Sequence, residues 1–175
     1  MLLARVSMVV ILGLQFSVPQ SLASQQSIQH DSFYAVQDYD PERDPAADLE
    51  QVAARATAER KRILVVIGGN WCIDCLNLDW IIAKTPAVKS MLRKAYLIMK
   101  VNIGPENRNE EFLSSYPGFE WVPHFYVLDS DGSLLHSQDT RELELGRSGG
   151  ERVFLRFLER WVLTGSGEQR AGSRE

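Results

Sequence analysis

Cysteine and histidine are scarce in this chain. Among its 175 residues are two cysteines, Cys72 and Cys75, and three histidines. So few cysteines exclude a framework of several disulfides, and a zinc site would need two ligands beyond the cysteines. The histidines show no ligand spacing with one another, so we expect no metal. Leu76 rather than histidine follows the second cysteine, which excludes covalent haem attachment.

A long apolar run and an excess of positive charge are also missing. The mostly apolar segment from Val6 to Val18 is shorter than the ~20 residues that a membrane-spanning helix needs. Lys and Arg number 19 against 23 Asp and Glu, for a formal net charge of -4. This balance gives no reason to expect nucleic acid or an anionic membrane as a partner.

The apolar segment has the order of a secretory signal. Arg5 precedes it, and the small residues Ser21 and Ala23 follow it. A positive start, an apolar centre and small residues at a cleavage point define a signal peptide. We therefore expect residues 1–23 to be a leader cleaved near Ala23, with an uncleaved membrane anchor as the alternative. The mature protein would then be periplasmic or secreted, where disulfides persist.

The remaining length suits one domain with a substantial apolar core. Residues 24–44 are polar and are expected to form an N-terminal arm with at most one short edge strand. Residues 45–163 are expected to be the folded domain. The final segment, 164–175, is rich in Gly, Ser and charged residues and is expected to be a disordered tail.

Helix and strand patterns alternate along the expected domain. Asp44-Pro45 and Thr85-Pro86 are typical helix starts, and the runs ILVVI and YLIMKVNI are typical of buried strands. The predicted elements are helices at 45–60, 72–83, 86–95, 107–116 and 151–163, strands at 63–67 and 96–103, and a hairpin of 124–129 with 133–137. This order predicts an α/β fold, with a central mixed sheet flanked by helices on both faces.

Cys72 and Cys75 are placed for redox chemistry. Cys72 falls where the first strand gives way to a helix, and the free N–H groups there lower a thiol pKa from its ordinary ~8.5. Cys75 lies one turn further along, within reach of Cys72. Cys72 can therefore attack a substrate disulfide and Cys75 can resolve the mixed disulfide. A purely structural disulfide is disfavoured, because closing so small a loop stabilises the fold by much less than the ~3 kcal/mol of a 15-residue loop.

The segments ILVVIGGNWCIDC, IMKVNI and WVPHFYVLD, in this order, resemble the thioredoxin superfamily over roughly residues 48–163. Trp71 before the first cysteine and Pro123 some fifty residues later match its most specific landmarks. The chain is most similar to secreted thioredoxin-like proteins and to the periplasmic C-terminal domain of the bacterial transmembrane disulfide reductase. The resemblance implies a thioredoxin fold.

The resemblance also implies a substrate platform. Pro123 is expected to follow a cis peptide bond, and the backbone of Val122 to pair with the substrate chain. Trp71 is expected to shield the active-site face, with a core tryptophan as the alternative on composition alone.

Three further residues are expected to tune the thiols. Lys100 matches the buried lysine beneath the family's cysteines, the alternative being a lysine at a strand edge. Asp74 opposes the Cys72 thiolate by its charge. His124 replaces the small polar residue common after the cis-proline, and is expected either to act on substrate or thiolate or to be a simple surface histidine. Val66 stands where the family has a buried acid, so this proton acceptor is missing.

The sequence therefore predicts a thiol–disulfide oxidoreductase with Cys72 as nucleophile and Cys75 as resolving thiol. Protein disulfides and thiols would be its partners, and no metal or organic cofactor is expected. A strong oxidant depends on a stabilised thiolate, which Asp74 disfavours, so the protein is expected to act as a reductase. A membrane-embedded partner would then supply its electrons. The alternative is a non-catalytic binding or folding-assistance module whose disulfide is passive.

Overall fold

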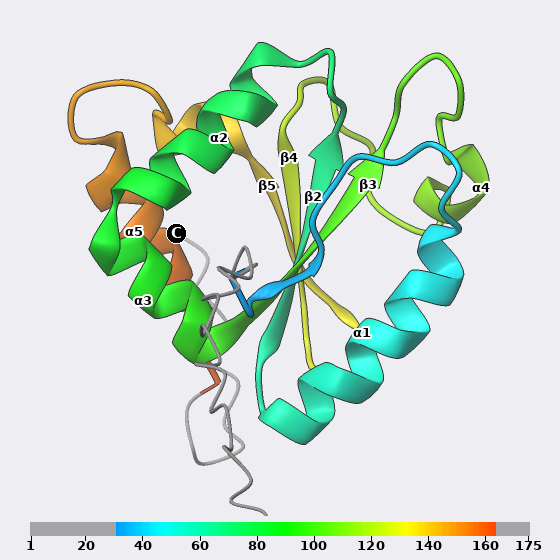
Figure 1. Cartoon of the computed structure of the whole chain (residues 1–175), viewed down its shortest axis with the longest axis horizontal. Coiled ribbons are helices and arrows are strands. Elements are labelled where there is room, and N and C mark those ends of the chain that lie inside the picture. Colours follow the sequence, from blue (N-terminus) through cyan, green and yellow to red (C-terminus); the bar gives the residue numbers. More distant parts are fainter. Residues whose placement is uncertain (1–30, 164–175) are drawn as a thin grey trace, which may run out of the picture.

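Five strands form one mixed sheet in the computed structural model, which describes residues 31–163 (Figure 1). The strand order is β1-β3-β2-β4-β5. The bounds are β1 Tyr34–Val36, β2 Arg62–Gly68, β3 Tyr96–Asn102, β4 His124–Leu128 and β5 Leu134–Asp139. Strands β1, β3 and β2 pair in parallel, β4 pairs antiparallel with β2, and β5 pairs antiparallel with β4. The mixed sheet confirms the predicted fold class.

Helices cover both faces of this sheet (Figure 1). One face carries α1 (Pro45–Glu59) and the short α4 (Glu110–Leu113), and the other carries α2 (Ile73–Lys84), α3 (Pro86–Ala95) and α5 (Gly150–Arg160). A 3-10 turn, η1 (Thr140–Leu143), joins β5 to the loop before α5. Within residues 31–163, no helix has the length and apolar character to cross a membrane.

The two central strands are buried along their whole length because helices cover both of their faces. Every residue of β2 and β3 is buried. Successive side chains point to opposite faces of a strand, so Leu64 and Val66 face the α2 side while Ile63, Val65 and Ile67 face the α1 side. This two-sided burial explains the uninterrupted apolar runs of the sequence.

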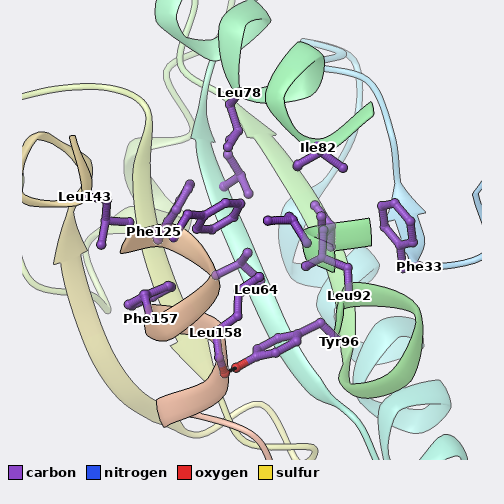
Figure 2. Packing of buried hydrophobic residues seen from close by; sticks show 14 of the residues in the cluster. Phe33, Leu64, Leu78, Ile82, Leu92, Tyr96, Phe125, Leu143, Phe157 and Leu158 are labelled. Atoms are coloured by element: carbon purple, nitrogen blue, oxygen red, sulfur yellow. Dashed lines mark hydrogen bonds between the residues drawn. The ribbon is translucent and has the colours of Figure 1, made fainter. Parts of the chain in front are cut away.

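The larger core lies between the sheet and helices α2, α3 and α5. Leu78 and Ile82 of α2, Leu92 of α3 and Leu158 of α5 converge on the sheet (Figure 2). Each is at most 3% exposed, and burying such a side chain contributes about 1.5–3 kcal/mol. The hydroxyl of Tyr96 donates to the backbone oxygen of Leu158 at 2.5 Å, which ties the end of α5 to β3.

Both predicted cap-and-proline starts are confirmed as helix starts. The side chain of Asp44 accepts hydrogen bonds from the backbone N–H groups of Ala46 and Ala47, and Pro45 is the first residue of α1. Pro86 is likewise the first residue of α3, but the side chain of its N-cap residue, Thr85, makes no capping hydrogen bond. These starts fix where α1 meets the sheet and where α2 gives way to α3.

The helix predicted at 107–116 is wrong in extent, since α4 has four residues. Asn109 adopts a left-handed conformation with φ 50°, so a right-handed helix cannot run through this residue. The side chain of Asn102 donates to the backbone oxygen of Asn107. The side chain of Asn109 in turn donates to the backbone oxygen of Asn102. These amide bonds hold 107–109 as a loop. The last helix is also shorter than predicted and ends at Arg160.

Part of the expected arm belongs to the sheet. Strand β1 pairs with β3, and Phe33 beside it is fully buried. The expected leader at 1–23, the start of the arm before residue 31 and the expected tail at 164–175 lie outside the described residues.

Candidate active site

Cys72 and Cys75 form a disulfide at the start of α2. Cys72 is the N-cap of this helix, directly after the loop that leaves β2, and Cys75 lies in its first turn. The backbone N–H of Cys75 points at Cys72 Sγ at 3.1 Å. Cys72 is 6% exposed and Cys75 fully buried, so an incoming sulfur meets Cys72 first. The order of an outer and a recessed thiol is the one predicted.

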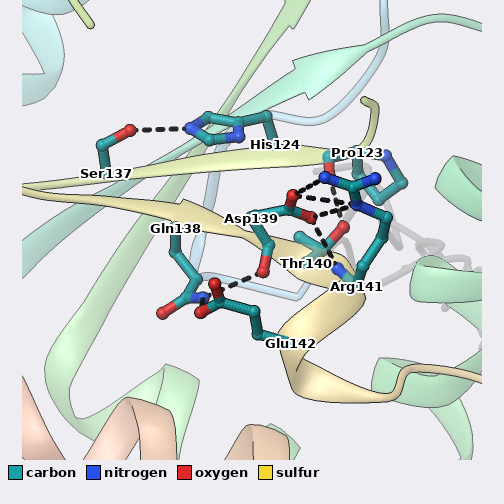
Figure 3. A network of polar contacts seen from close by, with 8 residues as sticks. All are labelled: Pro123, His124, Ser137, Gln138, Asp139, Thr140, Arg141 and Glu142. Carbon is teal, nitrogen blue, oxygen red and sulfur yellow. Dashed lines mark hydrogen bonds and ion pairs between the residues drawn. The ribbon is translucent and has the colours of Figure 1, made fainter. Parts of the chain in front are cut away.

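The loop before β4 lies against Cys72. The backbone oxygen of Val122 is 3.8 Å from Cys72 Sγ, and the Val122–Pro123 peptide bond is cis. The hydroxyl of Thr140 donates to the backbone oxygen of Pro123, which links this loop to η1 (Figure 3). The structure therefore brings together the two segments that the sequence marked as nucleophile and platform.

Exposed apolar side chains lie next to both segments of this contact in the sequence. Trp71 precedes Cys72 and Trp121 precedes Val122, and both are more than half exposed. Trp71 is therefore not a core residue. The exposed side of α2 adds Ile73, Leu76 and Trp80. Exposed apolar patches of this kind mark interaction surfaces.

Lys100 lies in the interior, on the central strand β3. Its side chain is 6% exposed, and Nζ is 2.6 Å from Oδ2 of Asp79 on α2. The same ammonium lies 5.4 Å from the ring centre of Tyr34 and 5.0 Å from that of Tyr39. The hydroxyl of Tyr34 donates to the other oxygen of Asp79. Lys100 is thus the centre of a buried cluster and not a strand-edge lysine.

The sequence reasoning missed Asp79, Tyr34 and Tyr39. Asp79 follows Cys75 by four residues, the spacing that places two side chains on one face of a helix, and this signal could have found it. The tyrosines enter through β1 and the chain after it, and no local pattern links them to Lys100. Val66, on β2, is 1% exposed on the same side of the sheet as the cysteines and supplies no acid there.

His124 faces away from the cysteines. It shares the α1 face of the sheet with Tyr126, its next neighbour but one on β4, whereas the cysteines belong to the α2 face. Its ring stacks on Phe119, and Nε2 lies 2.8 Å from the hydroxyl of Ser137 (Figure 3). Burial lowers the pKa of His124, against the opposing charge of Asp139. The structure does not bring this residue to the thiols.

Asp74 is exposed in the first turn of α2, where it accepts a hydrogen bond from the side chain of Asn77. Its carboxylate sits between the two cysteines in sequence and on the solvent side of the helix. Within residues 31–163, no group of three or more His, Cys, Asp or Glu side chains is arranged to hold a metal ion.

Comparison with known proteins supports the assignment of the fold. The family model described as Thioredoxin-like matches residues 44–130. The structure is similar to a disulphide isomerase from Xylella fastidiosa Temecula1, with 25% identity, a TM-score of 0.58 and coverage of 71% of this chain and 96% of that one. No curated protein matches the chain by sequence.

Two further solved structures are similar at lower scores. A thioredoxin from Thermus thermophilus has 19% identity and a TM-score of 0.49, covering 71% of this chain and 93% of that one. The oxidised C-terminal domain of Neisseria meningitidis DsbD has 21% identity and a TM-score of 0.48, covering 66% of this chain and 94% of that one.

Fold and site together define a thioredoxin-fold protein with a CxxC disulfide at the start of α2. The chain has the thioredoxin fold, and its residues 44–130 are similar in sequence to the Thioredoxin-like family.

Proposed function

We propose that this protein is a thiol–disulfide oxidoreductase that acts on other proteins. One observation carries the proposal. The Cys72–Cys75 disulfide caps α2, and Cys72 Sγ lies 3.8 Å from the Val122 backbone oxygen in the loop that ends at Pro123. A structural bridge needs no such neighbour, whereas an exchanging sulfur needs a platform that aligns the substrate chain.

The local geometry favours attack by Cys72. Once the disulfide is reduced, the Cys75 N–H that points at Cys72 Sγ becomes a hydrogen-bond donor to the thiolate, together with the partial positive charge of the helix start. The thiolate attacks a substrate disulfide, forms a mixed disulfide and releases one substrate thiolate. Cys75 then attacks Cys72 Sγ, which restores the Cys72–Cys75 bond and releases the second.

The surroundings favour a protein substrate. Trp71 and Trp121 flank the contact between Cys72 and Val122, and such exposed tryptophans bind apolar side chains of a partner. The guanidinium of Arg141, which is paired with Asp139, lies 4.9 Å from the ring centre of Trp121. An extended chain that pairs with the Val122 backbone would contact both tryptophans.

We further propose that the protein works as a reductase in the periplasm or another exported location. Asp74 adds negative charge beside the Cys72 thiolate, which disfavours a strongly oxidising couple. The resemblance to secreted thioredoxin-like proteins and the expected leader at 1–23 support export. A reductant in an oxidising compartment requires an electron donor, which would be membrane-embedded.

Reduction of insulin disulfides in the presence of dithiothreitol tests the proposal. We expect the wild type to accelerate the reaction, and Cys72→Ser to abolish the acceleration. Reduced Cys75→Ser, freed of dithiothreitol before insulin is added, should instead accumulate a mixed disulfide with insulin through Cys72, because the resolving thiol is gone. If the wild type gives no acceleration and Cys72 in the reduced protein does not react with iodoacetamide, the protein is a binding module with a passive disulfide.

A further inference from the structure

The hydroxyl of Tyr39 is a buried polar group that the proposed reaction does not yet use. Tyr39 follows β1 and is 2% exposed. Its hydroxyl has no hydrogen-bond partner among the described residues. An unpaired buried hydroxyl costs about 1–3 kcal/mol, so its presence at this position calls for a physical reason.

The hydroxyl and the sulfur of Cys75 border the same small space. A Cβ placed on Gly68 would lie 2.6 Å from Cys75 Sγ and 2.9 Å from the Tyr39 oxygen. Gly68 has no side chain, so none separates the sulfur from the hydroxyl. Glycine at the end of β2 is thus what allows the two groups to share this space.

Tyr39 is held in place by one contact to its ring and one to its backbone. The Lys100 ammonium lies 5.0 Å from its ring centre and is itself paired with Asp79. The side chain of Asn70, in the loop that leads to Cys72, donates to the backbone oxygen of Tyr39 at 3.1 Å. The loop that carries the cysteines and the segment that carries the hydroxyl are therefore fixed to each other.

Burial, followed by the charge of Asp79, raises the pKa of the Tyr39 hydroxyl. The group therefore keeps its proton at any physiological pH and acts as a donor, not as a base. In the oxidised protein the sulfur of Cys75 is a neutral disulfide sulfur and a weak acceptor. After reduction it is a thiolate or thiol, which is a much better one.

We propose that Tyr39 is the positioning residue that donates a hydrogen bond to Cys75 when the disulfide opens. The inference rests on the proposed function. A thiolate of a reducing partner attacks Cys72 Sγ and forms a new S–S bond with it. The Cys72–Cys75 bond breaks, its electron pair stays on Cys75 Sγ, and the Tyr39 O–H donates to this sulfur without transferring its proton. In the reverse direction the same bond holds Cys75 ready to attack Cys72 Sγ.

Tyr39→Phe tests the inference because it removes the hydroxyl alone. The readout is the pKa of Cys75, measured from the ¹³Cβ shift of labelled cysteine in the reduced full-length protein. We expect Tyr39→Phe to raise this pKa by about one unit, a tenfold change in the acid dissociation constant, since a hydrogen bond to a charged acceptor is lost. We also expect slower reduction of its disulfide by dithiothreitol, because the leaving thiolate is less stable.

Tyr96→Phe is the matched control. Tyr96 is buried in the same core, but its hydroxyl donates to Leu158. This variant should be less stable than wild type and leave the pKa of Cys75 unchanged, whereas Tyr39→Phe, which removes an unpaired hydroxyl, should be at least as stable as wild type in the oxidised form. An unchanged Cys75 pKa in Tyr39→Phe, or an equal change in both variants, would overturn the inference. The titration needs no catalysed turnover, so its failure is distinct from a failure of the insulin assay.

Discussion

The buried pair of Lys100 and Asp79 predicts an unequal response to loss of its two members. The Lys100 side chain is 6% exposed and that of Asp79 34%, with 2.6 Å between the charged atoms. Asp79→Ala leaves a charged ammonium inside the protein without its counter-ion. Removing one partner of a buried pair costs about 3–5 kcal/mol, and the partial exposure of Asp79 favours the low end, about 3 kcal/mol.

Lys100→Met should cost much less, about 1 kcal/mol or under, because the carboxylate left behind is partly hydrated and keeps its bond from Tyr34. Methionine also fills nearly the same volume. The double variant should therefore be more stable than Asp79→Ala alone.

Urea unfolding of the oxidised protein measures these differences. Glu110→Ala is the control for a surface charge, since its ion pair with Arg108 joins two well-exposed side chains and should contribute under ~1 kcal/mol. The reasoning is refuted if Asp79→Ala costs no more than Lys100→Met, or if Asp79→Ala and Glu110→Ala cost the same.

Two further predictions concern the surroundings of the site. Gly68→Ala would place a Cβ 2.6 Å from Cys75 Sγ, so it should destabilise the protein by about 1–3 kcal/mol. Gly118→Ala is the control, because its Cβ would meet nothing within 4 Å. Urea unfolding compares the two variants, and equal stabilities would contradict the packing described. Burial lowers the pKa of His124, so the unfolded chain takes up its proton first as the pH falls below ~6.5, and stability should decrease from there to the folded pKa. His124→Gln should flatten this part of the stability profile; an unchanged slope would exclude His124 as its source.

The elements that position the site could be predicted from the sequence because the patterns that indicate them are local. Proline-initiated helices, buried strands and the Cys72–Cys75 spacing each depend on neighbouring residues, and the structure confirms the helix starts and places the cysteines where a helix begins. The contact of Val122 and Pro123 with Cys72 was predicted from the resemblance to a family and not from any local pattern. The order of motifs shared with a family contains information on long-range contacts, which the periodicity of one segment does not.

The rest of the site could not be predicted because its contacts join distant segments. The Tyr39 ring meets Lys100 only because β1 pairs beside β3, and the arm that carries β1 has a polar composition. The position of His124 on the far face follows from the register of β4. That register depends on which alternate residues the two cores bury. Side-chain amides that hold 107–109 as a loop likewise outweigh the helical pattern of that segment.

The equilibrium reduction potential of the Cys72/Cys75 couple, titrated against glutathione on the purified protein, tests the central claim most directly. The account predicts a couple that equilibrates, with a value near the ~-270 mV of thioredoxin. A value near ~-120 mV would contradict the reductase direction and indicate an oxidant. A disulfide that does not equilibrate with glutathione at all would contradict the claim that these two cysteines exchange.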